Sequence, residues 1–138
     1  MMLVNRMFPA ATFEDLRREM DRVMNAFTRQ PNGRAFGAGT FPPVNVWEDG
    51  QAYFVEAEIP GVDLEAIDLQ VVGNELAIKG RRDLPEVEGT TFHRRERASG
   101  EFGRLVTLPA DVDAEKVVFY CGSGVTACHN LLAAARAG

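Results

Sequence analysis

A chain of 138 residues, 46% hydrophobic and 25% charged, has the size and composition of one globular domain and is too short for two complete ones. Its apolar runs stay well short of the roughly 18 residues that a membrane-spanning helix needs, so we expect no membrane insertion and a cytoplasmic location. The whole chain has a net charge of −5, and residues 41–120 are its acidic part, with sixteen acidic and eight basic residues, which argues against nucleic acid as a partner.

The first predicted element is an amphipathic helix in the segment TFEDLRREMDRVMNAF, residues 12–27. Thr12 and Asp15 stand three positions apart, as the two partners of a capping box do. Apolar residues then recur at spacings of three and four and share one helical face, namely Phe13, Leu16, Met20, Val23 and Phe27, widened by Met24. This face packs on its own domain or a partner helix, or it is an adaptable binding surface, because Met side chains reshape easily.

A flexible linker and a β-rich body follow the helix. The glycine-rich residues QPNGRAFGAGT (30–40) predict a linker, so residues 1–40 form an arm that is tethered rather than embedded. In residues 41–116, six runs predict strands: PVNVWED (43–49), QAYFVEAEIPG (51–61), AIDLQVV (66–72), ELAIKGRR (75–82), FHRRERAS (92–99) and EFGRLVTLP (101–109). With no helical pattern between them, they predict an all-β fold, an immunoglobulin-like antiparallel β-sandwich.

The body resembles the α-crystallin domain of the small heat-shock proteins, in its bacterial Hsp20 form. The similarity lies in PPVNVWEDGQAYFVEAEIPGVDLEAIDLQVVGNELAIKGRR and in ERASGEFGRLVTLPADVD, which fits the pattern E-R-x-x-G-x-F-x-R-x-x-x-L-P-x-x-V-D. Together with the amphipathic arm, residues 12–117 are covered, about three quarters of the chain.

This resemblance implies an ATP-independent holdase chaperone that binds partly unfolded proteins and uses no cofactor or metal. It also implies a homodimer or a larger oligomer, because in bacterial members the segment at the position of Arg81–Arg97 exchanges with the partner subunit. The implied client-binding residues are the apolar side chains of the arm: Met7, Phe8, Phe13, Leu16, Met20, Val23, Met24 and Phe27.

The C-terminal residues 117–138 depart from this family. The strand, N-G-V-L turn, core strand and I-x-I/V tail expected there are not recognisable, so we expect a sandwich incomplete at its C-terminal strands. The segment instead predicts an apolar strand at Val117–Tyr120, a loop at Gly122–Thr126 and a helix over Ala127–Ala137. We expect the apolar strand to cover part of the open sheet edge.

A thiol placed at such a loop faces the positive end of the helix, which lowers its pKa and makes Cys121 a candidate nucleophile. The motif CGSGVTA also resembles the active-site loop of the rhodanese and mercaptopyruvate sulfurtransferases. By resemblance, Cys121 carries a persulfide within a loop made of Gly122, Ser123, Gly124, Val125 and Thr126. Two alternatives to the holdase stay open: a sulfurtransferase acting through Cys121, and a recombinant or artefactual chimera with an inert tail.

Overall fold

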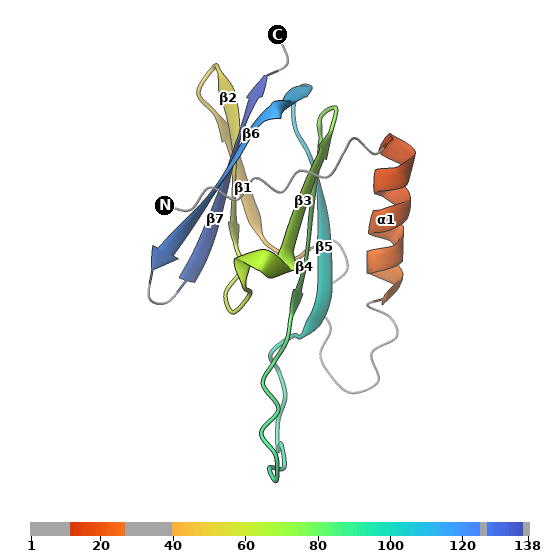
Figure 1. Ribbon diagram of the computed structural model, residues 1–138, viewed down its shortest axis with the longest axis vertical. Helices are drawn as coiled ribbons and strands as arrows, with labels where there is room; N and C mark the ends of the chain where they lie inside the picture. The colour runs from red at the N-terminus through yellow and green to blue at the C-terminus, as the bar shows by residue number, and fades with distance from the viewer. Residues whose placement is uncertain (1–11, 27–39, 125–126, 137–138) are drawn as a thin grey trace.

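The computed structural model describes residues 12–26, 40–124 and 127–136, with tail side chains only as far as Asp113. Its elements are the helix α1 (Phe13–Ala26), the strands β1 (Val44–Glu48) and β2 (Ala52–Glu58), the 3-10 helix η2 (Leu64–Ala66), and the strands β3 (Ile67–Val72), β4 (Glu75–Arg82), β5 (Gly100–Thr107), β6 (Val112–Gly124) and β7 (Ala127–Arg136). They form two facing sheets, in the orders β1-β2-β7-β6 and β3-β4-β5, with antiparallel pairing throughout (Figure 1). The predicted antiparallel sandwich with an N-terminal helix is confirmed.

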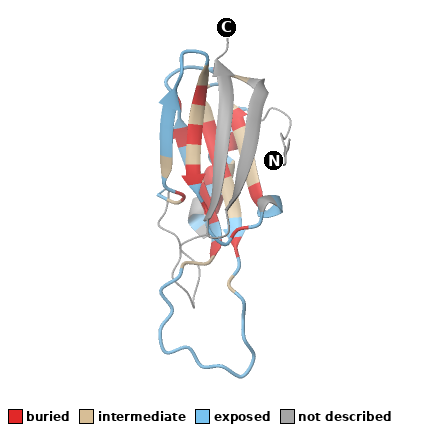
Figure 2. Cartoon of the chain, turned by 90° about the vertical axis from the view of Figure 1, so that its left-hand side faces the viewer, coloured by how far each residue is buried: buried red, intermediate tan, exposed pale blue. Residues whose placement is uncertain are grey.

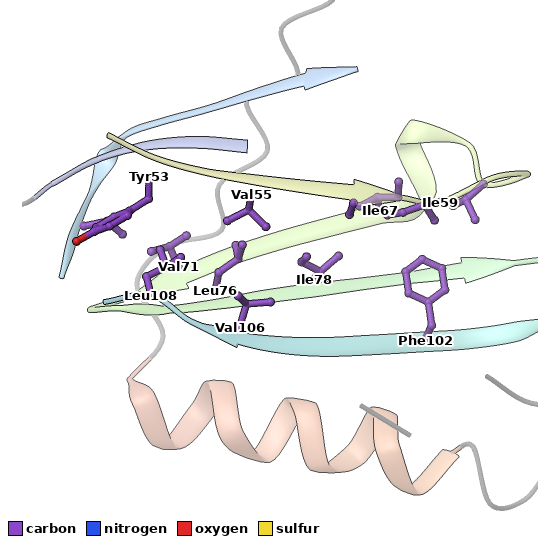
Figure 3. Close-up of a cluster of buried hydrophobic side chains, with 13 residues drawn as sticks. Tyr53, Val55, Ile59, Ile67, Val71, Leu76, Ile78, Phe102, Val106 and Leu108 are labelled. Carbon is purple, nitrogen blue, oxygen red and sulfur yellow. The ribbon is translucent and has the colours of Figure 1, made fainter. Parts of the chain in front are cut away.

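The core lies between the two sheets and follows the two-residue period of the strands. In β2, Tyr53, Val55 and Ala57 are buried, whereas the residues between them are half-buried. The facing sheet adds Leu76 and Ile78 from β4, and Figure 3 shows both side chains pointing into the space between the sheets. Buried residues accordingly run as stripes along the inner strands in Figure 2.

The turn between β3 and β4 connects this hairpin to the end of β5. Gly73 adopts a φ of 60°, a left-handed conformation that glycine tolerates without strain. The next residue, Asn74, donates from its side-chain amide to the Leu108 carbonyl at 3.0 Å, and its own carbonyl accepts from the Leu108 backbone N–H at 2.7 Å. Gly73 and Asn74 thus form a two-residue turn between the paired residues Val72 and Glu75.

The C-terminal segment does not form the predicted strand–loop–helix. The helix expected over Ala127–Ala137 is wrong, because β7 (Ala127–Arg136) is a strand that pairs with both β2 and β6. Local helix propensity is a weak preference. If residues 127–136 were helical, the edge of β2 that now pairs with them would have backbone N–H and C=O groups without these partners. The sandwich is therefore not short of its last strands, and β6 (Val112–Gly124) runs across the boundary expected at residue 116.

The run FHRRERAS also differs from its prediction as a strand. Residues 83–99 form a long irregular connection between β4 and β5, which projects beyond the sandwich in Figure 1. The ladder between β4 and β5 begins at the pair Arg82 and Gly100, so it leaves this connection outside the sheet. Within the described chain, the charged cluster at 93–97 has neither an apolar alternation nor a neighbouring strand that would hold it extended.

Candidate client-binding surface

Helix α1 begins with the predicted capping box. The Asp15 backbone N–H donates to the Thr12 hydroxyl oxygen at 3.2 Å, and the Thr12 backbone N–H donates to the Asp15 carboxylate at the same distance. The Thr12 hydroxyl also donates to that carboxylate at 2.7 Å. The hydrogen bond from the Thr12 side chain, followed by the one from its backbone, lowers the pKa of Asp15. These reciprocal contacts fix the start of the arm helix.

The apolar face of α1 packs on the outer side of the β3-β4-β5 sheet, away from the core of the sandwich (Figure 3). Leu16, Met20 and Val23 are 1%, 4% and 7% exposed. Leu16 and Met20 form a second small cluster with Ala77 of β4, and the half-buried Val72 packs against it. Of the two alternatives for this face, the structure contains packing on its own domain, so these three residues are not open to another protein in this arrangement.

The other predicted client-binding residues are placed differently or lie outside the described chain. Phe13, at the start of α1, is 48% exposed. Met7, Phe8 and Phe27 lie outside the described residues, as does the side chain of Met24. In the described part of the arm, only Phe13 among the predicted residues is exposed to solvent.

Strand β1 carries exposed apolar side chains at an edge of its sheet. Val46 and Trp47 are 41% and 42% exposed, and among the described strands β1 is hydrogen-bonded only to β2. The ring of Trp47 stacks on that of Phe54 in β2, with centroids 5.6 Å apart and planes at 11°. An edge strand with exposed aromatic and aliphatic groups is open to pairing with another chain.

The connection of residues 83–99 is a second exposed apolar region. Val87 is 60% and Phe92 is 54% exposed, and the guanidinium of Arg95 lies 4.1 Å from the centroid of the Phe92 ring. At the base, Arg82 donates to the Ala98 carbonyl from Nε at 3.0 Å and from Nη2 at 2.7 Å. Burial lowers the pKa of Arg82, and the charge of Arg97 lowers it further.

The geometry assumed for the sulfurtransferase loop is not present. Cys121 lies within β6, in register with Asn130 of β7, and Ser123 is in register with Cys128. Gly122 and Gly124 belong to the same strand, whereas Val125 and Thr126 lie outside the described residues. Because a strand and not a helix follows, no helix N-terminus is available to lower the pKa of the thiol.

The described ranges contain neither a cluster of metal ligands nor a membrane-spanning helix. Among residues 12–26, 40–124 and 127–136, no three His, Cys, Asp or Glu side chains gather as metal ligands would. The helices in the same ranges are too short or too polar to cross a bilayer.

Sequence reasoning missed the surface on which α1 rests. Ala77 of β4 is fully buried although it lies on the opposite face from Leu76 and Ile78. Gly103 is buried in the middle of β5, with no turn near it. The small side chain of Ala77 and the position of Gly103 inside a strand, away from any turn, are the signals that could have indicated a closely packed neighbour.

Comparison with known proteins places this fold in a family. The profile of the Hsp20/alpha crystallin family matches residues 45–127. Small heat shock protein C4 of Rickettsia felis is 34% identical over 85 residues, which are 61% of this chain and 52% of that protein. The 17.7 kDa class II heat shock protein of Arabidopsis thaliana is 37% identical over 60% of this chain and 55% of its own length. The chain thus spans about half the length of these two curated relatives.

Solved structures agree with this assignment. A mutant of hsp14.1 from Sulfolobus has a TM-score of 0.62 over 95% of each chain at 17% identity, which supports the fold alone. A small heat-shock protein from Xylella fastidiosa has a TM-score of 0.55 at 28% identity, over 73% of this chain and 91% of its own. The sandwich topology and the matched profile lead to one conclusion: the chain belongs to the Hsp20/alpha crystallin family.

Proposed function

We propose that this protein is an ATP-independent holdase of the small heat-shock type, which binds partly unfolded proteins in the cytoplasm and prevents their aggregation. The arm supports this role through an apolar helix that the sandwich does not use for its own core. Thirteen buried residues of the described part of the chain form the core between the sheets, and none of these thirteen comes from α1. Leu16 and Met20 of α1 belong to a separate small cluster on the outer face. An apolar stripe outside the main core is suited to binding exposed apolar segments of other proteins.

A light-scattering assay with a heat-labile client tests this function. We expect equimolar protein to suppress the scattering without ATP. The double variant Leu16→Ser/Met20→Ser should lose most of the protection, because it removes two apolar groups of the stripe. The matched control Arg17→Ser/Asp21→Ser changes two exposed residues of the same helix and should keep it. Unchanged scattering with the wild-type protein would contradict the holdase function.

The dimeric state is a second part of the proposal. The open edge of β1, with Val46 and Trp47 exposed, and the projecting residues 83–99, with Phe92 exposed, offer complementary apolar surface to a second copy. Sedimentation velocity of Trp47→Lys should show a shift from dimer or larger oligomer toward monomer. Leu105→Lys, at a residue of similar exposure on an edge strand of the other sheet, is the control and should leave the assembly unchanged. Equal sedimentation of both variants would argue against this interface.

A further inference from the structure

The outer face of the β3-β4-β5 sheet is shaped to receive a helix. In β4, Ala77 lies between the core residues Leu76 and Ile78 but on the other face, and it is as buried as they are. The side chains that cover it are Leu16 and Met20 of α1. We call this surface, made of Val72, Ala77, Lys79 and Gly103, the helix seat.

Gly103 sets how closely the helix approaches the seat. A Cβ atom added at this position would lie 2.8 Å from Val23 Cγ1, 3.3 Å from Met20 Cε and 3.5 Å from Val23 Cβ. Its backbone conformation is an ordinary strand conformation, so the position needs glycine for space rather than for backbone freedom. The side chains of α1 therefore rest directly on the backbone of β5.

One ion pair adds polarity to the seat. The Lys79 ammonium lies 3.2 Å from the Glu19 carboxylate, which also accepts from Arg22 at 2.9 Å. The side chain of Lys79 is only 18% exposed, so the helix covers much of it. The seat thus matches α1 in shape, through small side chains, and in charge.

We propose that α1 acts as an autoinhibitory cover, because its docking on the helix seat and its binding of clients exclude each other. This inference rests on the holdase function proposed above. Leu16, Met20 and Val23 are buried in the docked state, so a client gains access to them only after the helix leaves the seat. Among the described side chains, three apolar ones and one ion pair hold the helix, against thirteen core residues in the sandwich, so α1 undocks under milder conditions than those that open the sheets.

A reversible disulfide between helix and seat tests the cover. A Cβ atom added at residue 103 would lie 3.5 Å from Val23 Cβ, within the range of about 3.5–4.5 Å that disulfides use. The protein for the test is Val23→Cys/Gly103→Cys with both native thiols removed by Cys121→Ala and Cys128→Ala. The locked form is the protein oxidised with glutathione disulfide. We expect half-suppression of scattering to need about tenfold more of the locked protein than of the reduced protein, because the disulfide removes the undocked state that binds clients. Dithiothreitol should restore the protection.

Two single variants, Val23→Cys and Gly103→Cys in the same background, are the controls, and their protection should not depend on oxidation. Equal protection by locked and reduced protein would overturn the cover but leave the holdase function standing. No protection by either form, or by the wild-type protein, would instead overturn the holdase function. A thiol count showing that the disulfide does not form would contradict the docked geometry itself.

Gly103→Val tests the same inference from the opposite direction. Valine favours strands, and its side chain would occupy the space of Val23 and Met20, so the helix is displaced while β5 keeps its ladder. We expect severalfold stronger protection than the wild-type protein gives at the same temperature. Glu101→Val, at an exposed position of the same strand, is the control and should leave the protection unchanged. If hydrogen exchange shows α1 released in Gly103→Val but its protection equals that of the wild-type protein, the autoinhibitory role of α1 is refuted.

Discussion

Gly80→Ala adds one methyl group to a glycine in a crowded part of the sandwich. Gly80 lies in β4, in register with Phe102 of β5 and Ile67 of β3. The added Cβ would lie 2.5 Å from Phe102 Cζ and 2.9 Å from the Ala66 carbonyl oxygen. The Phe102 ring is 0% exposed and contacts Phe41 edge-on, with centroids 5.1 Å apart, so it has no open space to move into. The oxygen of Ala66 belongs to the backbone and moves only with its segment.

The expected magnitude follows from two opposing effects. Overpacking a filled core costs roughly 1–3 kcal/mol, and a contact with backbone on one side and a fixed ring on the other favours the upper end, about 3 kcal/mol. Replacing glycine by alanine also restricts the unfolded chain, which returns roughly 0.4–1 kcal/mol. The net loss in free energy of unfolding is therefore about 2 kcal/mol. With a urea m-value of about 1–2 kcal/mol/M, the midpoint should fall by about 1–2 M.

Urea titration followed by far-UV circular dichroism measures this shift. Gly103→Ala is the matched comparison, because it adds the same group in the adjacent strand, where the close neighbours are side-chain atoms of α1. The free energy of unfolding of the sandwich in Gly103→Ala should stay within about 0.5 kcal/mol of the wild-type value. An equal shift in both variants, or none in Gly80→Ala, would refute the assignment of one glycine to the core and the other to the helix seat.

Three further predictions concern the helix, the tail and the thiol. Burial raises the pKa of Glu19, but the hydrogen bond and charge of Lys79 and then those of Arg22 lower it more, so the net pKa is lowered. The folded value lies below the unfolded one, so docking should be strongest above the ordinary carboxylate pKa and weaken as the pH falls through the lowered value. Hydrogen exchange of α1 would show this, and an identical pH profile in Glu19→Gln would contradict it. A chain ending at Glu115 loses β7, the partner of β2, and should show no cooperative thermal transition; protection equal to that of the full chain would mean that the tail is dispensable. Cys121→Ser should leave aggregation protection unchanged, and thiocyanate formation from thiosulfate and cyanide should be absent in both proteins; a rate dependent on Cys121 would revive the sulfurtransferase hypothesis.

The elements that the sequence predicted well are those in which local pattern and tertiary packing agree. The alternation of Tyr53, Val55 and Ala57 matches a strand with one buried face, and the strand is present with that face inward. Thr12 and Asp15 form the predicted capping box because both partners lie within one helical turn. Such features need no knowledge of distant residues.

The predictions that failed depended on distant partners. The segment LLAAARA has the composition of a helix, but its strand pairing with β2 becomes visible only when the open edge of β2 is known. The sequence does not decide the docking of α1 for the same reason, because an amphipathic stripe has the same pattern whether its own domain or another protein covers it. The decisive residue, Gly103, lies about eighty positions after the helix and has no distinctive local pattern.

Arg82 closes the connection of residues 83–99 near its base by donating hydrogen bonds to the backbone carbonyl of Ala98, and it donates a third to that of Pro60 at 3.1 Å. Both acceptors are backbone atoms, so the closure does not depend on which side chains lie between the two ends. The entropy of closing a loop rises only slowly with its length. Evolution can therefore lengthen, shorten or rewrite this stretch with little effect on the sheets, and a reporter peptide grafted there should leave the host protein folded.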